Sequence, residues 1–287
     1  MLDGVGNSRV VPSVTTILNV LDKPGLQQWA ADQTAHYAVA NADRLLSRSE
    51  EQGFRMLRFY HSRMNSAKFD DPEYDLNDYH TGVLDDLAEL GTITHTAVQS
   101  IASGDFMPDL TRDEQVQMVE AYMDWESNHE IEVIAEELTV YGNYFAGSLD
   151  GIWNIDGVPT LLDIKTSKAI RDTHLAQLAA YSASETAAFE VPEGTEGAIE
   201  HTYTRDKVKR KAWFKMGTVP AFTQYAVLQL RPDEYMSDGS FRPAFCKLHI
   251  IPQEVIDVAY LLFQSALNAS ITTKMLADTL KEFPITD

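Results

Sequence analysis

Two aspartates and a lysine in the stretch GSLDGIWNIDGVPTLLDIKTSK, residues 147–168, have types and spacings suited to binding a metal ion. The Asp156-Gly157 pair within it is a strong signal for a two-residue hairpin turn. With that turn, the residue numbers of each opposed pair add up to 313, so Asp150 faces Asp163. Lys165 lies on the same face of its strand as Asp163, because side chains alternate along a strand. Opposed carboxylates repel each other unless a cation lies between them, and a divalent metal ion is the expected cation. An exposed hairpin that binds nothing is the alternative.

The elements around this hairpin change from helical to strand-like near Ile131. Apolar residues recur at helical spacing before that point, and extended patterns dominate after it. We expect helices at 13–21, 24–46, 49–65, 80–101, 111–129, 173–189 and 252–267. We expect strands at 131–141, 144–155, 158–165, 197–205, 208–216, 222–230 and 242–251. Residues 69–80 are expected to form a polar loop, and residues 281–287 a loose end.

The chain is acidic as a whole and basic in one predicted hairpin. Its 287 residues carry 23 basic and 43 acidic side chains, which gives a formal net charge of -20. Residues 203–217, in contrast, hold six basic side chains and one acidic side chain. This asymmetry indicates one face for solvent and another for an anion. A charged hairpin at the edge of a sheet is the alternative.

Cysteine usage and hydropathy limit the class of protein further. Cys246 is the only cysteine, which excludes disulfides within the chain and any four-cysteine zinc or iron–sulfur site. No apolar run reaches the length of a membrane span, and the N-terminus lacks the pattern of a secretory signal. We therefore expect a globular cytoplasmic protein that does not associate with a membrane.

The order of the motifs resembles the RecB-like branch of the PD-(D/E)XK nuclease superfamily, and most of all its phage-encoded exonucleases. In that family, Gly-x-x-Asp and Asp/Glu-x-Lys strands precede a helix with Gln-x-x-x-Tyr. The matching residues here are Asp150, Asp163, Lys165, Gln177 and Tyr181. The motif GTITH matches an upstream family helix through His95, and Glu137 matches a glutamate that begins the preceding strand, with Glu136 as the alternative. The similarity is close over residues 91–182.

The resemblance implies an α/β fold. The expected core is that of a PD-(D/E)XK nuclease, with an αβββαβ succession around a central mixed sheet and an N-terminal helical region. The corresponding limits are residues 1–79 for the helical region, 80–270 for the nuclease core and 271–287 for a C-terminal tail.

The resemblance also implies a Mg²⁺ or Mn²⁺ ion and no iron–sulfur cluster. The implied ligands are His95, Asp150, Asp163 and the backbone carbonyl of Ile164. Lys165 would orient a water molecule or stabilise developing negative charge. Gln177 and Tyr181 would position the substrate strand, and ordinary helix packing is the alternative for both.

DNA, single- or double-stranded, is the expected substrate. Contacts with its phosphates are expected from Lys168, Arg171, Arg205, Lys207, Lys209, Arg210 and Lys211, and stacking on unpaired bases from Trp213 and Phe214. The expected activity is that of an exonuclease in phage-type replication or recombination, with a protein of that machinery as a partner, in the cytoplasm of a bacterial host. A structure-specific endonuclease on the same core and a catalytically silent DNA-binding or inhibitory protein are the alternatives.

Overall fold

A computed structural model describes residues 11–21, 24–40, 42–43, 79–205, 208–236 and 238–282, with only the backbone at 24–28, 79–84, 203–205 and 208–210. The helix predicted at 49–65 and most of the loop predicted at 69–80 lie outside these residues. The chain forms two compact units, one made of Met1–Leu21 with His95–Asp287 and the other of Asp22–Thr94.

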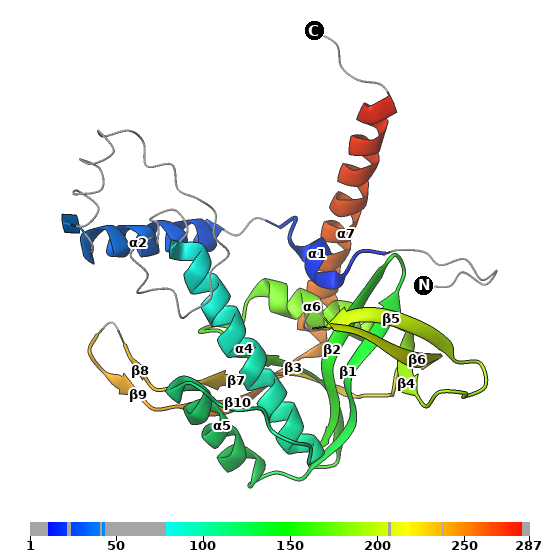
Figure 1. The fold of residues 1–287 in the computed structure, drawn as a ribbon, viewed down its shortest axis with the longest axis horizontal. Coiled ribbons are helices and arrows are strands. Elements are labelled where there is room, and N and C mark those ends of the chain that lie inside the picture. Colours follow the sequence, from blue (N-terminus) through cyan, green and yellow to red (C-terminus); the bar gives the residue numbers. More distant parts are fainter. Residues whose placement is uncertain are drawn as a thin grey trace. The chain divides into compact units, whose positions relative to one another are not determined.

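The larger unit is built on an eight-stranded mixed sheet in the order β10-β7-β3-β2-β1-β4-β6-β5 (Figure 1). The strands are β1 (Ile131–Gly142), β2 (Phe145–Ile155), β3 (Val158–Lys165), β4 (Thr186–Val191), β5 (Ile199–Arg205), β6 (Val208–Thr218), β7 (Gln224–Arg231) and β10 (Phe245–Ile251). β3 and β7 are parallel, and the other neighbouring pairs are antiparallel. A small hairpin of β8 (Glu234–Tyr235) and β9 (Phe241–Arg242) follows β7. The predicted α/β class is thus confirmed.

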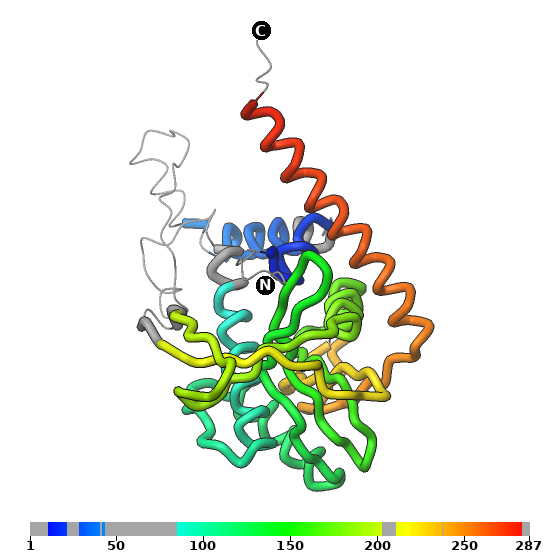
Figure 2. Tube along the Cα trace, turned by 90° about the vertical axis from the view of Figure 1, so that its right-hand side faces the viewer, coloured from blue at the N-terminus to red at the C-terminus, as the bar shows by residue number. Residues whose placement is uncertain are grey.

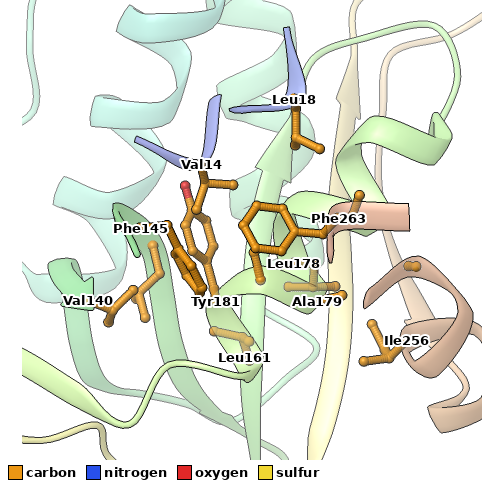
Figure 3. Close-up of a cluster of buried hydrophobic side chains, with 14 of the residues drawn as sticks. Val14, Leu18, Val140, Phe145, Leu161, Leu178, Ala179, Tyr181, Ile256 and Phe263 are labelled. Atoms are coloured by element: carbon orange, nitrogen blue, oxygen red, sulfur yellow. The ribbon is translucent and has the colours of Figure 1, made fainter. Parts of the chain in front are cut away.

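Helices cover both faces of this sheet. The helices of the described residues are α1 (Val14–Leu18), α2 (Pro24–Ala40), α4 (Tyr79–Ser103), α5 (Asp113–Glu126), α6 (Asp172–Ser182) and α7 (Gln253–Glu282). α1, α6 and α7 contribute Val14, Tyr181 and Phe263 to one core (Figure 3). Ile152 of β2 belongs to the same core. Trp153, the next residue of β2, instead contacts Tyr122 of α5. Because side chains alternate along a strand, α5 covers the opposite face.

The first hairpin has the register that its turn predicts. Ile155 pairs with Val158, and Gly151 pairs with Leu162. Asp156 and Gly157 both have positive φ, 51° and 82°, as a two-residue turn of this type requires. The backbone N–H of Glu130 donates to the carboxylate of Asp156 at 2.8 Å, which adds a side-chain bond to the turn.

Two predicted elements need correction. The helix expected at 173–189 ends at Ser182, because residues 186–191 pair as β4 with both β1 and β6. The final helix does not end near residue 267, and residues 271–282, expected to be a tail, are its last turns. Figures 1 and 2 show these turns extending away from the sheet.

The N-terminal segment belongs to the sheet unit rather than to a separate helical region. Ser13 caps α1 as predicted, since its hydroxyl accepts a hydrogen bond from the N–H of Thr16 at 3.1 Å. Ser13 also forms a parallel bridge with Ala146 at the start of β2. The boundary between the two compact units falls inside α4, after Thr94.

α7 is long and apolar enough, by length and composition alone, to cross a membrane. Its first half, however, places Ile256, Ala259, Phe263 and Ala266 in the core of the sheet unit. A core helix of this composition satisfies the same criteria, so membrane insertion does not follow from them.

Candidate active site

The centre of the site is a buried aspartate bonded to a lysine. Asp163 is fully buried in β3, and the ammonium of Lys165 donates to its Oδ1 at 2.7 Å. The other oxygen, Oδ2, is buried without a hydrogen-bond partner among the described residues. Burial, reinforced by the nearby Asp150 carboxylate and opposed by Lys165, raises the pKa of Asp163 to about 7. Burial alone would lower the pKa of Lys165, but the two carboxylates raise it.

Asp150 lies where the ladder between β2 and β3 ends. The last backbone pair is Gly151 with Leu162, and beyond it the Asp150 carboxylate accepts the N–H of Ile164 at 2.7 Å. The side chain therefore takes the place of a backbone partner. The predicted closeness of Asp150 and Asp163 agrees with the effect of one carboxylate on the pKa of the other.

A backbone distortion in β1 brings a third carboxylate to this point. Glu137 has a φ of 46°, in the left-handed region, which costs a residue other than glycine about 1–3 kcal/mol. Ala135, Leu138 and Val140 all pack against the same core, so the alternation of side chains reverses at Glu137. Ser148 of β2 donates to the Glu137 carboxylate at 3.4 Å. Glu136, the alternative, instead bonds Ser103.

Gln99 of α4 forms hydrogen bonds with both β1 and β2. No motif in the sequence indicated this residue. Its amide nitrogen donates to the Glu137 carboxylate at 3.1 Å and to the backbone carbonyl of Asp150 at 2.9 Å. Its side chain is buried. The available signal was its position one helical turn after His95, which places both residues on the same side of the helix.

His95 of α4 lies beside the Asp150 carboxylate. Its Nδ1 is 3.7 Å from an Asp150 oxygen, and the backbone of Ile164 also interacts with the ring. Burial lowers the pKa of His95, and Lys165 lowers it further, against the opposing effect of Asp150. A histidine with a lowered pKa is neutral at neutral pH, and the neutral imidazole is the form that binds metal ions.

Gln177 and Tyr181 contact each other on α6. The amide of Gln177 donates to the Tyr181 hydroxyl at 3.0 Å. The tyrosine ring is packed in the core, where a Cβ added at Gly147 would lie only 2.5 Å from it. Burial raises the pKa of Tyr181, and Asp163 raises it further. The ring therefore has a packing role, and its hydroxyl lies on the side of the carboxylates.

The carboxylate oxygens of this site suit a hard cation, but they do not form a complete set of metal ligands. Within the described residues, no three His, Cys, Asp or Glu side chains converge on one point as a metal site. The orphaned Oδ2 of Asp163 is the observation that fits a cation, because a buried carboxylate oxygen needs a partner. The Ile164 carbonyl would add a backbone oxygen.

The basic residues predicted to bind DNA are spread over distant parts of the sheet. Lys168 is paired with Glu234 beyond the end of β3, and Arg171 is exposed before α6. Lys211 on β6 pairs with Glu200 at 2.7 Å. β6 is separated from β3 by three strands, or about 19 Å along the sheet. The side chains of Arg205, Lys207, Lys209 and Arg210 lie outside the described residues.

No family model matches the chain, and no curated protein matches it. The structure defines an α/β protein with a mixed sheet in which two neighbouring strands hold a pair of carboxylates and a lysine.

Proposed function

We propose that this chain is a metal-dependent DNA nuclease, acting as an exonuclease with a PD-(D/E)XK core. The observation that carries the proposal is the buried Asp163, with one oxygen on Lys165 and the other unpartnered, next to Asp150. The chain order α4–α5–β1–β2–β3–α6–β4 supports it, because apart from the additional helix α5 it is an αβββαβ succession.

Asp150, Asp163 and the Ile164 carbonyl are the groups that would hold Mg²⁺ or Mn²⁺, with the neutral His95 as a fourth ligand. A hard divalent cation prefers oxygen ligands, and an imidazole favours Mn²⁺ over Mg²⁺. Bound there, the ion would neutralise phosphate charge and lower the pKa of a water molecule.

The chain's own groups position and stabilise the reacting atoms. The ammonium of Lys165, fixed by Asp163, carries positive charge into a buried site where negative charge develops during hydrolysis. The N–H of Ile164 fixes the Asp150 carboxylate. Gln99 holds the Glu137 carboxylate and the Asp150 backbone together, so it is a positioning residue.

Labelled DNA tests the proposal directly. We expect the purified protein to degrade end-labelled DNA with Mn²⁺ or Mg²⁺ and to be inactive in EDTA. Products released one nucleotide at a time, with closed circular DNA left intact, would indicate an exonuclease. Cleavage of circular or branched DNA would instead indicate the endonuclease. Metal-dependent binding without cleavage of any substrate would contradict catalysis and leave the silent DNA-binding protein.

Gln99→Leu is expected to lower the cleavage rate by about 10- to 100-fold, the usual cost of losing a group that orients a metal ligand. The variant removes the donor to Glu137 and to the Asp150 carbonyl but keeps the apolar part of the side chain. The two measured quantities are kcat at saturating DNA, which should fall, and the Mn²⁺ concentration that gives the half-maximal rate, which should rise.

Gln115→Leu is the matched control for this experiment. Gln115 is a fully buried glutamine of the same unit, and its Oε1 accepts the N–H groups of Thr111 and Arg112 before α5. Both variants lose buried hydrogen bonds, so a loss of activity common to both would mean that Gln99 acts only through folding.

A further inference from the structure

The segment after Lys165 is fastened to the strand beside it. β7 runs parallel to β3, and Gln229 pairs with Lys165. The Gln229 amide donates to the Ser167 carbonyl at 2.8 Å, and Arg231 donates to the Thr166 carbonyl at 2.6 Å. The chain that leaves β7 is therefore anchored to the strand of the candidate active site.

The segment that follows β7 forms the β8–β9 hairpin, in which basic side chains surround one carboxylate. Glu234 forms ion pairs with Lys168, Arg231 and Arg242. The hydrogen bond from Lys168, opposed by burial and assisted by Arg231, lowers the pKa of Glu234 to about 2, so it stays ionised. The Lys168 side chain is 76% exposed.

The other acidic groups of the hairpin are bonded within it. Asp233 accepts the N–H of Ala244 at 2.7 Å, and Asp238 accepts both the N–H and the hydroxyl of Ser240. The basic side chains of Lys168, Arg231 and Arg242 equal in number the acidic side chains of this region, which are Asp233, Glu234 and Asp238. It is thus electrically neutral in a chain of charge -20, and Lys168, its most exposed cation, stays largely open to solvent while paired with Glu234.

Two aromatic rings stand exposed on the same hairpin. Tyr235 and Phe241 are 78% and 53% exposed, and they face each other in the β8–β9 register. Their ring centroids are 5.3 Å apart. Exposed aromatic rings beside basic groups are the combination that binds unpaired bases and their phosphates. Tyr235 follows Gln229, the residue paired with Lys165, by six residues, so it lies within about 20 Å of that residue.

We propose that the β8–β9 hairpin is a binding platform for single-stranded DNA, on which bases stack on Tyr235 and Phe241 and phosphates contact Lys168 and Arg242. The proposal rests on the proposed nuclease function and specifies its substrate as an unpaired strand. In a duplex only the terminal base pairs leave a base face open, whereas every base of an unpaired strand can stack, so the platform favours the single strand. Figure 1 shows the hairpin at the end of β7.

The test is a binding measurement in EDTA, where no cleavage occurs. Fluorescein-labelled oligothymidylate and a blunt duplex of the same length are titrated by fluorescence anisotropy with wild type and with Tyr235→Ala/Phe241→Ala. We expect the double variant to bind the single strand at least about tenfold more weakly, since stacking contributes about 1–3 kcal/mol per base. Binding of the duplex should not change.

Two further arms keep the result specific. Wild type should bind an abasic version of the oligonucleotide as weakly as the double variant binds oligothymidylate. Lys168→Gln should reduce the slope of log K against log salt by about 0.7 for the lost phosphate contact. Phe106→Ala is the control variant, because Phe106 is 92% exposed and lies outside the hairpin.

The outcomes separate this proposal from the nuclease proposal. If wild type neither binds nor cleaves DNA of any form, the nuclease function is wrong. Suppose that wild type binds or cleaves DNA. If the double variant then binds oligothymidylate as tightly as wild type does, and wild type binds the abasic strand as tightly as oligothymidylate, the platform is wrong. A change in oligomeric state of the double variant by light scattering, with single-strand binding intact, would also overturn it and make the hairpin a protein interface.

Discussion

Lys165→Met is expected to lower the rate of DNA cleavage by at least about 10²-fold, the effect of removing one electrostatic stabiliser of a transition state. Methionine retains most of the volume of the buried side chain but provides no charge and no donor for Asp163. The measurement is the single-turnover cleavage rate at saturating Mn²⁺, with Lys274→Met on the exposed part of α7 as the control.

Asp163→Asn should be inactive for a different reason. It removes the buried carboxylate that would bind the cation, whereas Lys165→Met keeps it. We therefore expect Mn²⁺ to raise the melting temperature of Lys165→Met, which keeps the carboxylate, but to have little effect on Asp163→Asn. Cleavage near the wild-type rate in either folded variant would refute the assignment of this pair.

The hairpin was predictable because its information is local. Asp156 and Gly157 adopt the positive φ angles of a two-residue turn, and this turn alone fixes which residues of β2 and β3 are opposed. The closeness of Asp150 and Asp163 follows from that register without any knowledge of the remaining sheet.

β4 was not predictable in the same way. Its sequence, TAAFEV, contains alanines that suit a helix, and it directly follows a helix. Pairing with β1 on one side and β6 on the other makes it a strand, and β-propensity depends on such neighbours. The two-residue strands β8 and β9 are too short to produce any alternating pattern.

The acidic side of the site also depends on contacts between distant residues. Gln99 and Glu137 are separated by 38 positions, so their hydrogen bond is not encoded in any local motif. The left-handed backbone of Glu137 is likewise unexpected for a glutamate in a strand. Strain at a cluster of carboxylates is typical of functional sites, where neighbouring contacts maintain it.

Asp150→Asn is expected to abolish cleavage and yet leave the metal-free protein as stable as wild type, or more stable by about 0.5–1 kcal/mol. The asparagine oxygen can still accept the N–H of Ile164, which the wild-type carboxylate accepts at 2.7 Å. The substitution also removes a negative charge next to Asp163. The measurement is the free energy of unfolding in EDTA.

Asp150→Ala provides the comparison that isolates the charge. Alanine removes both the charge and the acceptor, and the N–H of the fully buried Ile164 then has no side-chain partner from this position. An unsatisfied buried donor costs about 1–3 kcal/mol, so this variant should be less stable than wild type in EDTA. Both variants should lose cleavage, but only one should lose stability.

Metal addition should reverse the order of wild type and Asp150→Asn. Mn²⁺ that binds only the native state stabilises wild type by mass action, and the asparagine variant, with a weaker ligand, should gain much less. Wild type must therefore overtake or approach the variant in melts with Mn²⁺. If Asp150→Asn were instead less stable than wild type in EDTA by more than about 1 kcal/mol, repulsion between the two carboxylates would not be the dominant interaction of Asp150. The inference of a cation site from their opposition would then fail.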